Sequence, residues 1–128
     1  MRESLERIGR FDERRAFERF RRSFRPQYTR LIINPDGSLA GCVAVGPSED
    51  ALLLEHFYIF PERQGGGLGS AVLRQLLGEA DHVGLPVRLS VLRQSEAGRF
   101  YARHGFAVIG RDDWDVYYER QPRPPQIP

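Results

Sequence analysis

A glycine-rich stretch between two regular patterns restricts the fold of this chain more than any other feature. Residues 62–69 read Glu-Arg-Gln-Gly-Gly-Gly-Leu-Gly. An apolar run, Ala51–Phe60, precedes the stretch, and a helical spacing of apolar residues, Leu68–Val83, follows it. Glycine permits positive φ angles and close approach of a ligand to the backbone. We therefore expect a strand, a glycine loop and a helix whose first-turn N–H groups can bind a phosphate.

The spacing within the loop distinguishes between the known phosphate-binding patterns. A Walker loop requires a lysine, and the chain contains none. The dinucleotide pattern requires a glycine at position 70, where the chain has Ser70. The pattern that remains is Gln64-x-x-Gly67-x-Gly69. The structural alternative is a tight turn into a helix that binds nothing.

Composition indicates one ordinary globular domain. The 128 residues are 41% hydrophobic and 28% charged, and the net charge of +2 does not favour nucleic acid as a partner. Cys42 has no second cysteine to pair with, so we expect it in the core. No apolar run approaches the roughly 18 residues of a membrane helix, and the charged N-terminus does not resemble a signal peptide. We expect a cytoplasmic domain over residues 1–121 and a proline-rich tail over residues 122–128.

The remaining patterns predict a mixed α/β fold. Arg2–Phe24 reads as a helix whose arginines alternate with glutamates, which favours a solvated face over a nucleic-acid surface. Strands are predicted at Tyr28–Asn34, Leu39–Gly46, Ala51–Phe60, Val87–Leu92, Phe106–Gly110 and Trp114–Arg120, and further helices at Leu68–Val83 and Glu96–His104. The first three strands should form an antiparallel meander. The strand–helix–strand unit should make the third and fourth strands a parallel pair.

The third predicted strand contains two unusual residues. Strict alternation places Glu55 and Phe57 on one face and His56 on the other, and both faces are otherwise mostly apolar. A buried carboxylate is costly unless it is paired or protonated. Glu55 is therefore either a structural partner, for example of Arg30 or Arg88, or a group with a raised pKa that can accept a proton. For His56 we favour a structural role.

A second motif lies near the C-terminus. Residues 94–106 read Gln-Ser-Glu-Ala-Gly-Arg-Phe-Tyr-Ala-Arg-His-Gly-Phe. This segment resembles the signature Asn-x-x-Ala-x-x-x-Tyr-x-x-x-Gly-Phe of the GNAT acetyltransferases, with Ala97 and Tyr101 in register and Gln94 in place of the usual asparagine. The pattern Gln64-x-x-Gly67-x-Gly69 resembles the coenzyme A pyrophosphate loop of the same family. The two motifs are separated by a helix and a strand, as in the family, and the resemblance covers about Tyr28–Arg120.

The resemblance implies a GNAT fold, a mostly antiparallel sheet flanked by helices in which two parallel strands splay apart. Acetyl-CoA would lie between those strands, here Ala51–Phe60 and Val87–Leu92. The family's first strand, normally placed before Arg2, has no counterpart in this sequence. Either the start of the chain is truncated or the sheet edge is covered in another way, and an uncovered edge would favour pairing with a second copy in a homodimer.

The resemblance also implies a set of site residues. The expected cofactor-binding residues are Phe57, Tyr58 and Ile59 for the pantetheine arm, Gln64, Gly65, Gly66, Gly67, Leu68 and Gly69 for the pyrophosphate, and Gln94 and Tyr101. Tyr101 stands at the position of the catalytic acid. Glu55 stands where several family members carry a catalytic glutamate. Ribosomal-protein N-terminal acetylases carry a glutamate at the position of Leu89, which argues against the same substrate here.

Three functions are compatible with these observations. The leading one is direct transfer of the acetyl group of acetyl-CoA to an amine, expected to be a small molecule, with no metal involved. The second is a CoA-binding domain without turnover, and the third is an interaction module that uses the arginine-rich helix. Glu55 and Tyr101 favour the first over the second, and the intact loop disfavours the third.

Overall fold

The computed structural model describes residues 26–124. The helix predicted at Arg2–Phe24 and the last four residues of the tail lie outside the described residues. The strands are β1 (Thr29–Ile33), β2 (Leu39–Ser48), β3 (Ala51–Ile59), β4 (Val87–Leu92), β5 (Ala107–Arg111) and β6 (Asp115–Arg120). The helices are α2 (Leu68–Val83) and α3 (Ala97–Arg103), with short 3-10 turns η1 (Pro26–Tyr28) and η2 (Pro61–Arg63). The predicted types are therefore confirmed throughout this part of the chain, with ends that differ by a few residues.

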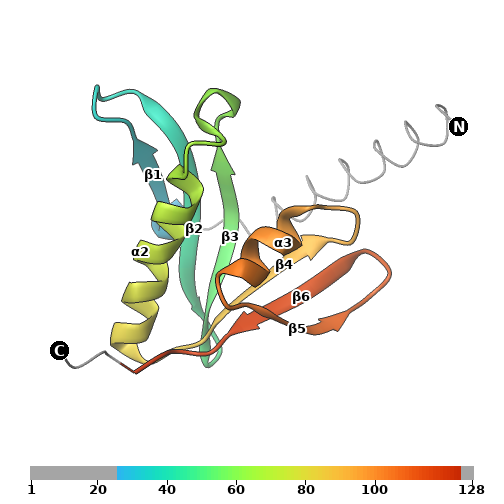
Figure 1. The fold of residues 1–128 in the computed structure, drawn as a ribbon. Helices are drawn as coiled ribbons and strands as arrows, with labels where there is room; N and C mark the ends of the chain where they lie inside the picture. The colour runs from blue at the N-terminus through green and yellow to red at the C-terminus, as the bar shows by residue number, and fades with distance from the viewer. Residues whose placement is uncertain (1–25, 125–128) are drawn as a thin grey trace, which may run out of the picture.

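The strands form one mixed six-stranded sheet in the order β1-β2-β3-β4-β6-β5. The antiparallel meander of β1, β2 and β3 is confirmed, and so is the parallel pairing of β3 with β4. That parallel ladder has two residue pairs, Leu52 with Val87 and Leu53 with Arg88. Beyond them the two strands diverge, as Figure 1 shows. The sheet therefore consists of two half-sheets, β1-β2-β3 and β4-β6-β5, that meet at a short seam.

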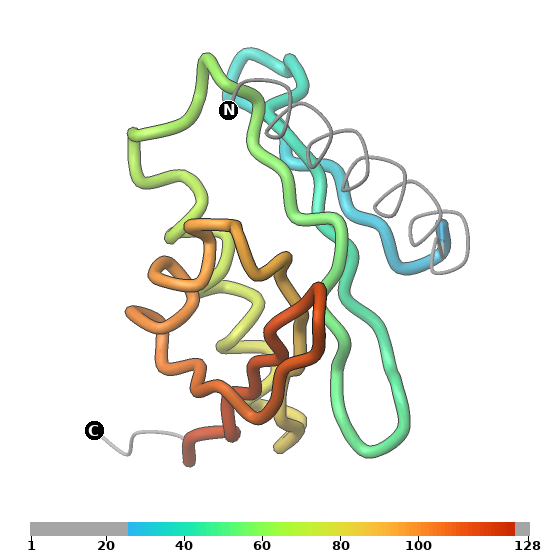
Figure 2. Tube along the Cα trace, turned by 90° about the vertical axis from the view of Figure 1, so that its right-hand side faces the viewer, coloured from blue at the N-terminus to red at the C-terminus, as the bar shows by residue number. Residues whose placement is uncertain are grey.

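Both described helices lie on the same side of strands β1–β3 (Figure 2). Helix α2 has the predicted bounds and ends at Gly84, which adopts the left-handed conformation with φ 73°. The core between helices and sheet is formed by Val43, Leu54, Leu73, Leu76, Leu77, Ala80, Val87, Leu89, Tyr101 and Phe106. Among residues 26–124, no helix has both the length and the apolar composition that crossing a bilayer requires.

A β-bulge in β3 corrects the alternation expected for this strand. Cys42 pairs with Tyr58, but Ala44 pairs with Glu55, so β3 carries one extra residue between these pairs. His56 lies there with a φ of 52°, a left-handed conformation that is unusual for a side chain other than glycine. The bulge reverses the alternation, and Phe57 packs against the same core cluster as Leu54. The expectation that Phe57 shares a face with Glu55 was therefore wrong.

Two further expectations about this region need correction. Cys42, expected to fill the core, is half-buried, and its thiol donates a 3.5 Å hydrogen bond to the His56 carbonyl oxygen at the bulge. Glu55, expected to be buried, is also only half-buried. Both residues border the bulge, because Cys42 bonds the bulged residue and Glu55 directly precedes it.

Candidate functional site

The glycine loop presents a row of backbone N–H groups at the start of α2. Gly65 and Gly67 have φ angles of 84° and 83°, a conformation that glycine adopts without steric cost. The first hydrogen bond into the helix runs from the Ala71 N–H to the Gly67 carbonyl oxygen at 3.0 Å. Among the described residues, the N–H groups of residues 65–70 donate to no backbone carbonyl. The loop therefore offers several donors to an anion at the positive end of the helix dipole.

The loop is held by its own side chain and is open on the ligand side. The Gln64 amide donates a 2.8 Å hydrogen bond to the Ile59 carbonyl oxygen, which ties the loop to the end of β3. Apart from the adjoining residues in the chain, a Cβ atom placed on Gly65, Gly66 or Gly67 would meet no atom of residues 26–124 within 4 Å. These positions therefore border solvent-accessible space, and the positive φ angles explain the need for glycine at two of them.

A cavity of about 560 Å³ opens over this loop. Its lining residues come from the end of β3, the glycine loop, the first turn of α2, and α3: Phe57, Tyr58, Ile59, Gln64, Gly65, Gly67, Gly69, Ser70, Ala97, Phe100, Tyr101 and Arg103. The volume lies within the range typical of small-molecule sites. Most of the residues expected at a cofactor site are therefore neighbours in space.

A second cavity, of about 270 Å³, lies in the wedge between β3 and β4. It is lined by Leu54, Glu55, His56 and Phe57 of β3, by Leu89, Ser90, Val91 and Leu92 of β4, and by Ser95, Ala97 and Tyr101. The two cavities share Phe57, Ala97 and Tyr101, so they adjoin each other. Together they connect the glycine loop to the interior of the splayed sheet.

Tyr101 lies where the two cavities meet. Its side chain is 9% exposed and packs edge-on against Phe100 and Phe106. Among the described residues its hydroxyl has no hydrogen-bond partner, although it lines both cavities. Burial raises the pKa of Tyr101 to about 12. The hydroxyl is therefore protonated at neutral pH and available as a proton donor to a group in either cavity.

Glu55 faces the same wedge as Tyr101, because both line the smaller cavity. The two arginines named as structural partners of Glu55 bind other carboxylates. Arg30 donates to Glu79 at 2.9 Å. Arg88 donates to Glu119 at 2.7 Å and to Asp50 at 3.0 Å. The geometry thus places a carboxylate and a phenol around one cavity between the strands.

The sequence motifs did not identify Phe100 of α3, which lines the larger cavity, or His104 directly after α3. Phe100 packs near the first turn of α2, because a Cβ on Gly69 would lie 3.6 Å from its ring. Ser70 Oγ and His104 Nε2 lie 3.1 Å apart and join the two helices. Burial, and then the positive charges of Arg74 and Arg103, lower the pKa of His104. Phe100 and His104 are about one helical turn apart, and both contact the first turn of α2, which the sequence alone does not show.

Three predicted cofactor residues line neither cavity, and one of them is Gly66 in the middle of the glycine loop. Gln94 is exposed in the turn between β4 and α3 and lines neither cavity. Leu68 is half-buried at the first position of α2 and also lines neither cavity. Their side chains are therefore not part of the cavity walls, although the Leu68 N–H belongs to the row of loop donors.

Comparison with known proteins assigns this arrangement to a family. A family model described as an acetyltransferase (GNAT) domain matches residues 2–115. A comparison with curated protein sequences finds no match.

Solved structures resemble the chain in fold. PaiA N-acetyltransferase from Thermoplasma acidophilum, solved in complex with coenzyme A, is 27% identical with a TM-score of 0.63 over 69% of this chain and 57% of that protein. This chain thus matches little more than half of that relative's length. Nourseothricin acetyltransferase is 28% identical with a TM-score of 0.64 over 73% of this chain and 64% of its own. An acetyltransferase from Bacillus cereus matches 88% of this chain and 90% of its own with a TM-score of 0.64, but at 16% identity it supports the fold alone.

Proposed function

Because the chain belongs to the GNAT acetyltransferase family, we propose that it transfers the acetyl group of acetyl-CoA to an amine. The observation that carries this proposal is the pair of adjoining cavities, one over the glycine loop and one in the wedge of the sheet. An acyl-CoA presents a diphosphate, an extended arm and a thioester in that order. The cavities present a row of N–H donors, a diverging strand edge and a buried tyrosine in the same order.

The residues present fit such a ligand on physical grounds. The N–H groups of residues 65–70 suit the charge of a diphosphate. Past Leu53, the edge of β3 that faces β4 leaves its ladder, and backbone polar groups in such a position require partners. An extended amide-containing arm beside Phe57–Ile59 would supply them. In this proposal Gln64–Gly69 hold the diphosphate, and Gln94, which lines neither cavity, would reach the arm only after its side chain turns toward the wedge.

Acetyl-CoA would supply the acetyl group as an activated thioester. Transfer forms the C–N bond of an amide and breaks the C–S bond, so the amine nitrogen loses a proton and the departing sulfur gains one. We assign the second proton to Tyr101, because its hydroxyl is protonated and lines both cavities. Among the described residues that hydroxyl also makes no hydrogen bond that would hold it away from the sulfur.

Glu55 is the proposed acceptor of the proton that leaves the amine. It lines the wedge cavity with Tyr101. In an amine acetyltransferase this position allows the carboxylate to act directly or through a water molecule. The competing account, a purely structural Glu55, is tested by substitution in the Discussion.

Two measurements test the function. Isothermal titration of the full chain with acetyl-CoA should give saturable binding, whereas an interaction module without a cofactor site would give none. A thiol-release assay with acetyl-CoA and a panel of small amines should then show turnover with at least one amine. Binding without thiol release across primary amines, polyamines, amino acids and aminoglycosides would contradict the enzyme and support a CoA-binding domain.

A further inference from the structure

The two half-sheets meet at a seam that is short and lies directly beside the wedge cavity. Its ladder consists of the pairs Leu52 with Val87 and Leu53 with Arg88, supplemented by a 2.9 Å hydrogen bond from the Leu52 N–H to the Pro86 carbonyl oxygen. The next residue on each strand, Leu54 on β3 and Leu89 on β4, already lines the wedge cavity. Arg88 is therefore the last residue of β4 before the strands separate.

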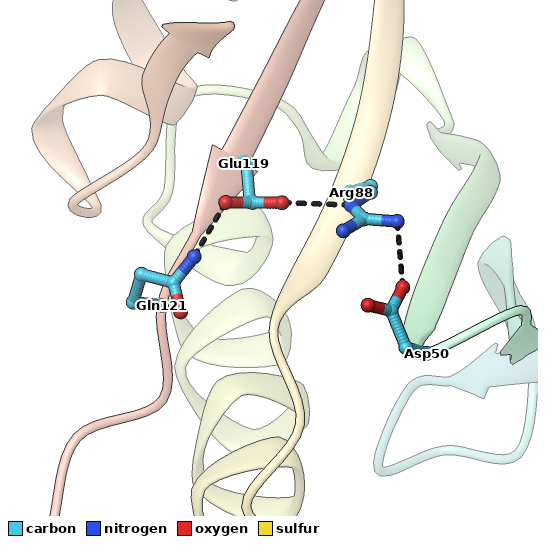
Figure 3. Close-up of polar contacts among 4 residues, drawn as sticks. All are labelled: Asp50, Arg88, Glu119 and Gln121. Atoms are coloured by element: carbon cyan, nitrogen blue, oxygen red, sulfur yellow. Dashed lines mark hydrogen bonds and ion pairs between the residues drawn. The ribbon is translucent and has the colours of Figure 1, made fainter.

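The Arg88 side chain bridges the seam, as Figure 3 shows. Its Nε donates a 2.7 Å hydrogen bond to Glu119 Oε2 on β6, within its own half-sheet. Its Nη1 donates a 3.0 Å hydrogen bond to Asp50 Oδ1 in the turn that joins β2 and β3, on the other half-sheet. The Gln121 amide donates to the second oxygen of Glu119 and holds that carboxylate in place. One planar guanidinium therefore connects both halves of the sheet.

The exposure of the bridging side chains indicates that the bridge affects the relative position of the half-sheets more than the folding stability of the chain. The Asp50 side chain is 79% exposed, whereas Arg88 is 33% and Glu119 17% exposed. An exposed ion pair contributes little to folding stability. The more buried bond to Glu119 holds the Arg88 guanidinium against β6. The exposed bond to Asp50 then sets where the β2–β3 turn lies relative to that guanidinium.

A small rotation at the seam has a large effect at the open end of the wedge. Residues 54–58 extend about 16 Å from the seam at roughly 3.3 Å per residue, so a rotation of about 5° moves the far end by ~1.4 Å. A misplacement of ~1 Å between reacting groups can reduce a rate by about 10²-fold. The geometry of the seam therefore sets how far Glu55 and His56, on β3, lie from helix α3, which follows β4 in the chain.

We propose that Arg88 and Asp50 are positioning residues that set the opening of the wedge for the arm and thioester of acetyl-CoA. This inference rests on the proposed function. The inference goes beyond the proposed function because it assigns a role to two residues that line neither cavity. The bridge acts on the part of the cofactor that enters the wedge. It does not affect the glycine loop, which lies on the far side of Tyr101.

The test compares two ligands that share the nucleotide end. Acetyl-CoA would occupy both the loop and the wedge, whereas 3′-phospho-ADP would occupy the loop alone. In Asp50→Ala we expect the Kd for acetyl-CoA, measured by titration, to rise about threefold to tenfold and kcat at saturating acetyl-CoA to fall by at least as much. The Kd for 3′-phospho-ADP should stay within about twofold of wild type. Arg88→Lys, which keeps the charge but loses the fork that reaches two carboxylates, should behave in the same way.

Glu49→Ala is the matched control. Glu49 precedes Asp50 in the same turn, carries the same charge and makes no recorded contact among the described residues, so this variant should match wild type with both ligands. Equal effects on both ligands in Asp50→Ala, or no effect on either, would refute the positioning role while leaving the enzyme assignment intact. A wild-type chain that binds no acetyl-CoA would refute both.

Discussion

At the residue scale, burial determines what Tyr101 can do. Desolvation of its ring raises the pKa of the hydroxyl to about 12, which keeps the proton on the oxygen well above neutral pH. A higher pKa makes the hydroxyl a weaker acid than an exposed tyrosine, but the group stays protonated and can hydrogen-bond to the sulfur as the C–S bond breaks. It also regains readily any proton that it gives.

The first prediction concerns that hydroxyl. Tyr101→Phe keeps the ring in the core and removes the proton donor, so kcat should fall about 10²-fold, while the Kd for acetyl-CoA changes less than threefold. Steady-state kinetics between pH 6 and pH 9 measure the effect. Tyr117→Phe removes a hydroxyl that donates to Asp112 outside both cavities and serves as the control. A Tyr101→Phe enzyme with wild-type kcat throughout this range would show that the ring only packs.

The second residue-scale prediction concerns Glu55. A general base takes up a proton in the transition state, and such catalysis contributes about 10²–10⁴-fold to a rate. Glu55→Gln keeps the shape of the side chain and removes the base, so kcat/KM should fall about 10²-fold with little change in melting temperature.

Glu79→Gln is the control for Glu55→Gln, because it removes one carboxylate from the outer face of α2, where Glu79 pairs with Arg30. If Glu55 is a structural partner instead, the melting temperature falls and kcat/KM of the folded fraction stays near that of wild type. That pattern would remove Glu55 from the reaction.

At the element scale, the union of β3, the glycine loop and α2 creates the anion site. No single element provides it: the strand end supplies the anchor for Gln64, the loop supplies positive φ angles, and the helix supplies the dipole. The bulge at His56 belongs to the same scale. It turns Phe57 toward the helices, where it lines both cavities.

A substitution pair tests the loop. Gly67→Asp places a negative charge beside the row of N–H donors, so the Kd for acetyl-CoA should rise at least tenfold, or about 1.4 kcal/mol. Gly67→Asn adds a side chain of nearly the same size that tolerates the left-handed conformation, and it should weaken binding less. The difference between the two variants isolates the charge. Equal affinity of a folded Gly67→Asp chain and wild type would place the diphosphate elsewhere.

At the scale of the whole molecule, a partly buried ion pair joins the C-terminal strand to α2. The Arg120 side chain is 6% exposed, and its guanidinium donates to both oxygens of Asp81 at 2.8 and 3.2 Å. The Arg123 N–H donates to Asp81 Oδ1 at 2.9 Å, so the start of the tail is held at the same point. The hydrogen bond from Arg120 lowers the pKa of Asp81. This contact therefore couples the last strand of one half-sheet to the helix that covers the other.

The prediction at this scale is a pH-dependent loss of stability. Asp81→Asn leaves Arg120 buried without its charged partner, so the free energy of unfolding at pH 7 should fall by about 3 kcal/mol and Tm by roughly 10 °C. Since the folded pKa lies below the ordinary value of 3.8, the stabilisation is present above that value and disappears as pH falls through the folded pKa. Thermal unfolding at pH 7 and at pH 2.5 measures how far the difference between the variant and wild type narrows.

The control for this prediction is Asp113→Asn, which removes an exposed carboxylate without a recorded contact among the described residues. It should leave Tm within about 1 °C of wild type. A gap between Asp81→Asn and wild type that stays constant down to pH 2.5 would show that the ion pair is not its cause.

The local sequence determined most of the elements, because their signals are local. The bounds of α2 follow from apolar spacing and from Gly84, and the loop follows from glycines that must take positive φ angles. Such features depend on backbone geometry within a few residues, which the residue types themselves restrict. Tyr101 became a candidate in another way, because residues 94–106 resemble a motif of the family.

Only the tertiary structure decided which of those residues face one another. Nothing near His56 announces a bulge, because a histidine with a positive φ is maintained by pairing with β2 and not by its own preference. The partners of Arg30 and Arg88 were likewise beyond the sequence, since a chain with many carboxylates offers many pairings and packing selects among them. The wedge itself arises because the β3–β4 ladder stops after two pairs. The sequence by itself could determine the elements and the glycine loop. The position of Phe100 beside α2 and the bridge at the seam depend on tertiary packing, because each joins segments that are far apart in the chain.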